Sequence, residues 1–499
     1  MEMQFEKRVL TCLEPRLCEI RNGEETLEIR LPEGMPDVGK IVASWGQPIL
    51  RSKQWHTDRL SFSGGMMVWV LYLPEREEQP QCLQGWIPYT MGWDLPPETE
   101  EGTLRIDLLT RFVDARTTSA RKIMVRSGLS AAAEGWTARE AAVPVPGNIP
   151  RELQLLQGKR PLRLIREAGE KAFQLTERLT LPPSAPKPDK LLTYLLTPAI
   201  SEKKVVANKL VFRGGGNLHI LYADQDGQLH CWDFPLAFSQ YAQLEESYGT
   251  GAWADVKLCT TALEAETDPE GAIEIKSAVT AQYLVSEQEL VETVEDAYAP
   301  GGTVRLEHQK LSLPVVLDAW EDSLEAERSL SGQMDVSVDT WTIVDRPRQR
   351  TQDGQIRLEF PGQIQMLCYG ADGNLSSASG RFEGKLAVKA DPSCLLSVQT
   401  GMIPEPQLVM GADSTEAEIQ IPVRITAMGM ENLEVVCAVS MEHKREADRE
   451  GPSLIIRRAG KADLWEIAKA TGSTMEAIRK ANSLEEEPSE GQLLLIPVR

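Results

Sequence analysis

Apolar and polar residues alternate with a period of two along most of the chain. Every second residue is apolar within 104–108, 218–222, 363–368 and 419–423. A period of two is typical of strands that bury one face against a core. Dipeptides that favour hairpin turns lie among these runs, namely Asp226-Gly227, Asp353-Gly354 and Asp372-Gly373. The pattern therefore predicts a mainly β protein built from antiparallel sheets.

One pattern recurs along the chain at an interval of 150 residues. The run 62–72 begins Phe-Ser-Gly-Gly and ends Leu-Tyr, and it returns at 212–222 as Phe-Arg-Gly-Gly to Leu-Tyr. A shortened form occupies 360–369. A recurrence at fixed spacing indicates tandem units of one fold. We therefore expect three antiparallel β-sandwich or barrel-like repeats, each with its own core, at 1–145, 146–296 and 297–447.

The third repeat departs from this spacing. Its Leu313-Pro314 pair precedes Phe360 by 47 residues, whereas the corresponding distance in the first two repeats is 31. The extra residues predict an insertion near 318–332. Because this stretch is rich in glutamate, a good helix former, we expect a helix there.

The last residues, 452–499, follow a different pattern. A short apolar run at 454–456 predicts a strand, and the spacing of apolar residues in 464–470 and 475–482 predicts two helices. Gly472 is placed to end the first helix, and Ser473 or Thr474 to begin the second. A closing strand at 491–497 completes a small βααβ domain.

Three spaced motifs in this segment resemble the LysM family: Leu-Trp-x-Ile-Ala at 464–468, Ala-Asn-x-Leu at 481–484 and the Gly-Gln-x-Leu-x-Ile-Pro run at 491–497. LysM domains usually bind glycans that contain N-acetylglucosamine, through the loop before the first helix and the loop before the last strand. The resemblance implies a partner-binding surface formed by these two loops. The expected contact residues are Lys461, Asp463, Leu464, Asn482, Leu484, Glu485 and Gly491.

The upstream repeats resemble the SPOCS domain of clostridial spore-coat proteins, through the Met-Pro-Asp-Val-Gly-Lys-Ile run at 35–41 and the Phe-x-Gly to Leu-Tyr strands. Three such repeats followed by one LysM domain resemble the SipL type of coat-morphogenesis protein. The resemblance implies a non-enzymatic scaffold in the mother-cell cytoplasm that is recruited to the forespore surface. Its LysM domain would bind a morphogenetic ATPase of the coat basement layer, and its β repeats would contact other coat proteins.

Charge and composition narrow the possible partners. The 499 residues include 53 Lys+Arg and 74 Asp+Glu, which give a formal net charge of −21. A chain this acidic lacks the basic surplus that nucleic acids and anionic membranes attract. The longest uncharged apolar run, Met66 to Leu73, is far shorter than a membrane span and predicts a buried strand. The N-terminal residues show no secretory signal, which favours a cytosolic protein ligand for the LysM domain.

Residues that could support catalysis or metal binding do not form a recognisable set. The five histidines are scattered without metal-ligand spacing, and His219 and His230 are expected on the surface of one hairpin. The eight cysteines form no Cys-x-x-Cys motif and are expected to be reduced thiols, mostly in the core. Trp69, Trp232 and Trp341 lie in strand-like runs and are expected in the core. We therefore expect no enzymatic activity, no metal and no cofactor.

One alternative function follows from the LysM resemblance itself. A LysM domain that retains glycan binding would make this a peptidoglycan-binding protein of the spore cortex or envelope. An envelope-associated hydrolase would need a nucleophile or a pair of catalytic carboxylates, and the sequence shows no motif that supplies them.

Overall fold

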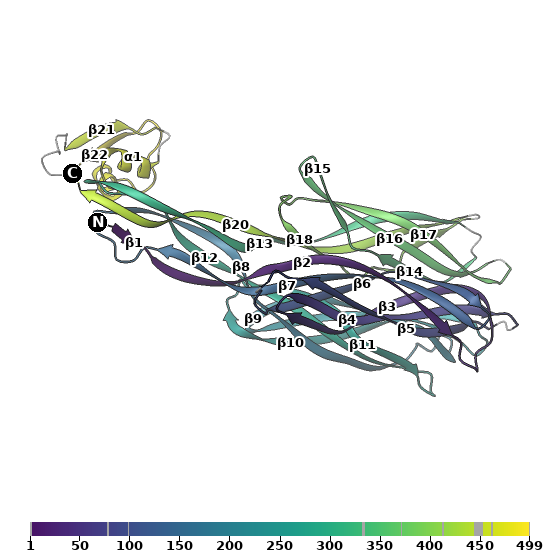
Figure 1. The fold of residues 1–499 in the computed structure, drawn as a ribbon. Coiled ribbons are helices and arrows are strands. Elements are labelled where there is room, and N and C mark those ends of the chain that lie inside the picture. Colours follow the sequence, from purple (N-terminus) through teal and green to yellow (C-terminus); the bar gives the residue numbers. More distant parts are fainter. Residues whose placement is uncertain are drawn as a thin grey trace.

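The computed structural model describes residues 2–76, 79–97, 99–331, 335–370, 372–411, 414–443, 453–460 and 463–498. It is mainly β with two short helices, and its strands pair antiparallel, which confirms the fold class expected from the periodicity. The molecule is elongated, with a thick body at one end and a narrow stalk at the other (Figure 1). Both chain ends lie at the stalk end.

The first segment forms two antiparallel sheets. Its strands are β2 (Glu6–Arg30), β3 (Val38–His56), β4 (Arg59–Pro74), β5 (Gln81–Asp94), β6 (Thr103–Ser119) and β7 (Lys122–Val145). One sheet has the order β2-β7-β6, and the other has the order β3-β4-β5. The first and last strands, β2 and β7, pair along almost their whole length to form a long ribbon. The uncharged run 66–73 lies in β4, and all but two of its residues are buried, as expected.

The second segment also pairs its first and last strands. It comprises β8 (Gln154–Leu179), β9 (Lys190–Ala223), β10 (Leu229–Tyr248), β11 (Trp253–Thr267) and β12 (Ile273–Tyr298). β12 pairs with β8 along a second long ribbon and with β11 on its other side, while β9 pairs with β10. The single strand β9 corresponds in sequence position to both β3 and β4 of the first segment, which lie about 150 residues earlier.

The third segment contains a third long ribbon. Its strands are β13 (Gly302–Ser331), β14 (Val336–Val344), β15 (Arg348–Gln352), β16 (Gln355–Tyr369), β17 (Leu375–Val388), β18 (Leu395–Thr400), β19 (Gln407–Met410) and β20 (Ser414–His443). β13 pairs with β20, and β16 pairs with β14, β15 and β17. The short β1 (Glu2–Gln4) also pairs with β20.

The helix expected near 318–332 is wrong: residues 318–331 continue β13 and pair with residues 414–427 of β20. Leu324, Ala326 and Leu330 are buried at even spacing, and glutamates stand between them on the exposed side. The period of two in this stretch outweighs the helix propensity of its glutamates, because pairing with β20 buries one face.

The recurring Phe-x-Gly motif has a packing explanation. Phe62, Phe212 and Phe360 are completely or almost completely buried. A Cβ atom added at Gly64 would lie 2.2 Å from the Ile49 carbonyl oxygen, and one at Gly214 would lie 2.1 Å from the Ala199 carbonyl oxygen. Both distances are far below any tolerable contact, so only glycine fits where the neighbouring backbone approaches this closely.

The recurring tyrosines also have equivalent partners. The Tyr72 hydroxyl donates to the Pro36 carbonyl at 3.0 Å, and the Tyr222 hydroxyl donates to the Pro186 carbonyl at 3.1 Å. Each bond ties the end of a strand, β4 or β9, to a loop residue 36 positions earlier. The same sequence spacing therefore serves the same local contact in the first and second segments.

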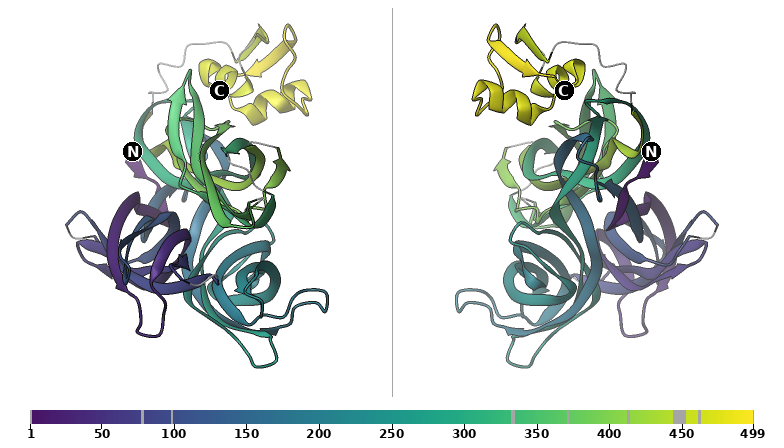
Figure 2. Two further views of the ribbon diagram at one scale, coloured as in Figure 1. Left: turned by 90° about the vertical axis from the view of Figure 1, so that its right-hand side faces the viewer. Right: turned by 90° about the vertical axis from the view of Figure 1, so that its left-hand side faces the viewer.

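The three ribbons pack side by side along the stalk and share one apolar core. Its members come from β2, β7, β8, β12, β13 and β20: Leu10, Cys12, Ala141, Val143, Leu162, Leu164, Val291, Leu311, Leu313, Val315, Leu433 and Val435. Seen along the long axis, the three segments surround a common centre (Figure 2). The first and third segments also have large cores of their own, but along the stalk the three ribbons share one core, because a lone two-stranded ribbon cannot cover its apolar face.

The C-terminal module consists of β21 (Leu454–Arg458), α1 (Leu464–Thr471), α2 (Met475–Asn482) and β22 (Leu493–Pro497), with β21 and β22 antiparallel. Gly472 ends α1 at a φ of 67°, and the Thr474 hydroxyl caps α2 by accepting from the Ala477 amide. Both helix caps are at residues that the sequence pattern predicted. Among the described residues, no helix is long and apolar enough to cross a membrane.

Candidate protein-binding site

The C-terminal module is docked on the end of the stalk through α1. The Trp465 indole Nε1 donates to Asp296 Oδ2 at 2.8 Å, and the Lys469 ammonium pairs with the same carboxylate at 2.7 Å. Asp296 belongs to β12 of the second segment. This charged and aromatic contact fixes one side of α1 against the body of the protein.

An aromatic contact completes this docking interface. The Tyr298 ring meets the Trp465 ring edge to face, with centroids 4.8 Å apart, and the Tyr298 hydroxyl donates to the Ser473 carbonyl at 2.9 Å. Burial raises the pKa of Tyr298 to about 12. Burial also tends to raise the pKa of Asp296, but hydrogen bonds from Lys469 and Trp465 outweigh it and hold that pKa below its ordinary value. The Asp296 carboxylate is therefore charged at neutral pH.

Three of the residues predicted to contact a partner serve the interior of the module instead. Leu464 is fully buried in its core. The Asn482 side chain bonds to both backbone groups of Leu495, accepting at 2.7 Å and donating at 2.6 Å, and so holds the closing strand. Leu484 packs half-buried against the same core. Their side chains leave little surface for a partner.

The other residues predicted to contact a partner belong to the loop before α1 and the loop before β22. The Asp463 carboxylate caps α1 by accepting from the Glu466 amide at 2.8 Å. Glu485 is exposed, and Gly491 is exposed with a φ of 85°. Lys461 lies outside the described residues. The two loops are bridged by Glu487, whose carboxylate accepts from the Leu464 amide at 2.9 Å.

Sequence reasoning missed an exposed apolar surface on the module, which we call the outer sheet face. It is formed by alternate residues of β21 and β22 that point away from the helices, and all are at least two-fifths exposed: Leu454, Ile456, Leu493 and Leu495. Ile456 and Leu495 stand directly opposite each other across the two strands. The intervening residues Leu494 and Ile496 are fully buried in the module.

A signal for this face was present in the sequence. The runs Leu454-Ile455-Ile456 and 493–496 are apolar at consecutive positions rather than at alternate ones. A strand with two apolar faces is buried on both sides or exposes one of them. In a two-stranded sheet covered by helices on one side only, the second face remains open.

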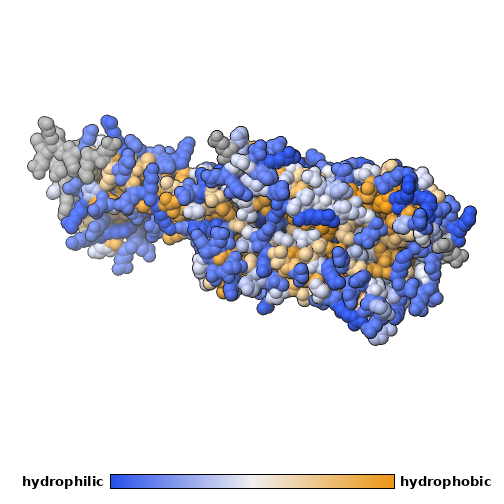
Figure 3. Space-filling view, turned by 60° about the horizontal axis from the view of Figure 1, so that its bottom comes forward, coloured by the Kyte–Doolittle hydropathy of each residue, from blue (hydrophilic) through white to orange (hydrophobic). Residues whose placement is uncertain are grey.

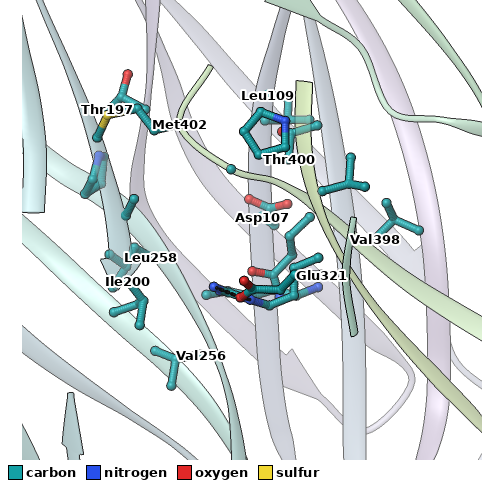
Figure 4. Close-up of a pocket in the computed structure, with 18 of the residues that line it drawn as sticks. Asp107, Leu109, Thr197, Ile200, Val256, Leu258, Glu321, Val398, Thr400 and Met402 are labelled. Carbon is teal, nitrogen blue, oxygen red and sulfur yellow. Dashed lines mark hydrogen bonds and ion pairs between the residues drawn. The ribbon is translucent and has the colours of Figure 1, made fainter. Parts of the chain in front are cut away.

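The body also contains a cavity between the three segments, with a volume of about 270 Å³ (Figure 4). Strands of all three segments line it. Four of its charged groups form two pairs: Arg346 bonds Asp107 at 2.8 Å, and Arg424 bonds Glu321 at 2.7 Å. Within the described ranges, no cluster of three or more metal-ligating side chains occurs. The Arg346–Asp107 pair ties the third segment to the first. The Arg424–Glu321 pair joins β20 to β13, the two strands of the third segment's ribbon.

The two histidines expected on the hairpin surface lie in less exposed places. The His219 Nδ1 atom is 2.8 Å from Asp233 Oδ1 on the neighbouring strand, and its Nε2 atom is 3.1 Å from Asp339 Oδ1 of the third segment. His230 pairs with Asp224 at 2.9 Å. The expectation of surface residues is wrong for His219, because the third segment packs over its strand.

The cysteines and tryptophans divide between buried and partly buried positions. All eight cysteines are free thiols, of which four are buried and four partly buried. Trp69 is buried, as expected, whereas Trp232 and Trp341 are only partly buried. The tryptophan of the module, Trp465, is covered by the body through its contact with Tyr298.

No protein-family model, no curated protein and no solved structure matches this chain.

Proposed function

We propose that this protein is a non-enzymatic scaffold of spore-coat assembly whose C-terminal module docks a morphogenetic ATPase of the coat basement layer. The outer sheet face is the observation that carries the proposal. Four large aliphatic side chains lie together on one small sheet and face solvent. Exposed apolar patches of this kind are typical of surfaces that bind another protein.

The position of the module supports the same function. Its helix α1 packs against Asp296 and Tyr298 of the second segment. The outer sheet face lies on β21 and β22 and is exposed to solvent. A binding surface held on a rigid support loses less entropy when a partner binds. The body would then act as a spacer that presents the module at one end of an elongated molecule (Figure 1).

The chemistry of the face favours a protein over a glycan. Sugar sites combine aromatic surfaces with hydrogen-bonding groups, but this face is aliphatic, and the module's tryptophan is covered by Tyr298. Arg458 ends β21 beside the apolar residues and offers a charged rim. The resemblance to coat-morphogenesis proteins supports the class of partner and the location on the forespore surface in the mother cell.

A capture experiment tests the proposal. The full chain and a chain that ends at residue 452 are immobilised separately and exposed to the purified coat ATPase. We expect capture by the full chain only. Equal capture by both chains would overturn the role of the module. Sedimentation of the full chain with insoluble peptidoglycan, in the absence of any binding to the ATPase, would favour the glycan-binding alternative.

A further inference from the structure

A second cavity, which we call the central cavity, lies where the three segments meet and has a volume of about 650 Å³. Each segment contributes a tryptophan to its wall: Trp45 from β3, Trp232 from β10 and Trp341 from β14. The rings of Trp45 and Trp341 lie 4.7 Å apart. Aromatic walls of this kind accept the apolar and cationic parts of small organic molecules.

The charged groups in the wall are mainly acidic. His219 stands between Asp233 and Asp339, so that two carboxylates face one imidazole. Glu405 adds a further carboxylate at an exposed position, while Asp107 is neutralised by Arg346. Among the described residues that line the central cavity, there is no lysine or arginine.

The Asp339 carboxylate is the least satisfied of these groups. Its side chain is 1% exposed, and neither of its oxygens has a hydrogen-bond partner among the described residues, although Oδ1 lies 3.1 Å from His219. The indole N–H groups of Trp45 and Trp341 also lack acceptors within the described part of the chain. A buried carboxylate whose one charged neighbour, His219, is shared with Asp233 is costly, so the site is suited to a ligand that supplies a further donor.

Protonation of His219 does not remove this excess of negative charge. Burial tends to lower the pKa of His219, but the carboxylates of Asp339 and Asp233 outweigh it and raise that pKa to about 10. The imidazolium is therefore charged at neutral pH. One positive charge balances only one of the two carboxylates that contact it.

We propose that the central cavity binds a small organic ammonium compound that also carries an oxygen acceptor. The ammonium group would donate to Asp339, the hydroxyl or carbonyl oxygen would accept from an indole N–H, and the carbon chain would lie against the tryptophan rings. A neutral alcohol leaves the wall's net negative charge uncompensated, and a carboxylate adds to it. This site is separate from the outer sheet face and does not depend on the proposed function.

Three probes with one carbon skeleton test the ligand class. Binding of 4-amino-1-butanol, 1,4-butanediol and 4-hydroxybutyrate to the full wild-type chain is measured by calorimetry or ligand-observed NMR. We expect the amine to bind at least about tenfold more tightly than the diol, since one charged hydrogen bond distinguishes them. Binding of the diol or the acid as tightly as the amine would overturn the proposal, as would an amine Kd weaker than about 10 mM.

Variants locate the site. Asp339→Asn removes the charge with little change of shape, and we expect it to weaken amine binding at least about tenfold. Asp353→Asn, in an exposed turn, is the matched control and should leave binding unchanged. Should Asp339→Asn fail to fold, Trp232→Leu tests the same wall, because its half-buried ring faces the cavity. Unchanged affinity in the folded wall variant would contradict the assignment.

A further comparison identifies the source of the ammonium group, which a free amine or a lysine side chain could supply. N-acetyl-lysine amide carries the same ammonium with neighbouring carbonyl acceptors. Binding of 4-amino-1-butanol alone would assign the cavity to a free metabolite-sized amine. Tighter binding of the lysine derivative would assign it to a lysine of a protein partner.

Discussion

The Arg105 guanidinium donates a 2.6 Å hydrogen bond to the Asp255 carboxylate, and the two residues are 150 positions apart in the chain. This separation equals the interval at which the sequence pattern of the first segment returns in the second. Corresponding positions of β6 and β11 therefore carry opposite charges and meet in a buried contact between the first and second segments. Glu134 and Lys257 complete a buried four-charge network, with a bond of 2.6 Å between them.

Removal of Arg105 should destabilise the whole body. Arg105→Met leaves Asp255 buried without its paired cation and removes one of the two cations beside Glu134, which keeps Lys257. We expect the free energy of unfolding to fall by about 3–5 kcal/mol. Urea unfolding followed by tryptophan fluorescence measures this change. Arg126→Met, which breaks an exposed pair with Glu24, is the control and should have almost no effect.

The double variant Arg105→Met with Asp255→Leu separates the charge pair from general packing. Because both partners are removed together, its loss of stability should be smaller than the sum of the two single losses. Strict additivity of the two substitutions would show that these residues do not interact in solution.

The glycines of the recurring motif give a second prediction about stability. Gly64→Ala and Gly214→Ala each place a Cβ atom against a backbone carbonyl that cannot move away easily, so each should cost about 1–3 kcal/mol. Gly251→Ala is the matched control, because nothing lies within 4 Å of its added Cβ. Thermal unfolding of the three variants compares them, and equal midpoints would argue against the close backbone approach.

The raised pKa of His219 predicts a dependence of stability on pH. A group whose pKa rises on folding, here from 6.5 to about 10, stabilises the folded state fully below its unfolded pKa and progressively less up to its folded pKa. The contribution of His219 should therefore decline as the pH rises from 7 to 10, by up to about 1.4 kcal/mol per unit. His219→Gln should show a flatter decline over this window. Parallel pH profiles for the two proteins would contradict the paired imidazolium.

Several features of the fold followed from the sequence because they depend on local patterns. The alternation at 218–222 identifies strands, and the spacing of Gly472 and Thr474 identifies helix ends, since each signal needs only neighbouring residues. The glutamate-rich stretch 318–331 misled the prediction, because its composition favours a helix while its pairing with β20 decides the structure. Composition is a weak guide where a partner strand buries one face.

Contacts between segments did not follow from the sequence. A period of two shows that one face of a strand is buried, but it does not show which distant strand covers that face. The stalk core, in which Leu10, Leu164 and Leu313 come from three segments, was therefore invisible at the sequence level. The same holds for Trp465, whose partner Asp296 lies 169 residues earlier.

The docking of the C-terminal module should depend on Asp296. Asp296→Ala removes the acceptor for Trp465 and Lys469, and we expect amide hydrogen exchange in α1 to accelerate about tenfold or more. Glu295→Ala is the control, because that neighbour approaches Arg160 of β8 instead. Because the pKa of Asp296 is lowered, the interface should also weaken as the pH falls through that folded-state value. Exchange that is unchanged in Asp296→Ala would show that the module is held by other contacts.

The central claim, that the outer sheet face docks a protein partner, is tested most directly by the affinity of the full chain for the coat ATPase with one side chain changed. Ile456→Asp puts a charge in the middle of the face, where Ile456 is 66% exposed, and Ile20→Asp makes the same change at an isoleucine of β2 that is 54% exposed. We predict that Ile456→Asp weakens binding at least about tenfold while Ile20→Asp leaves it unchanged. Equal affinities for the wild type and Ile456→Asp would contradict the account.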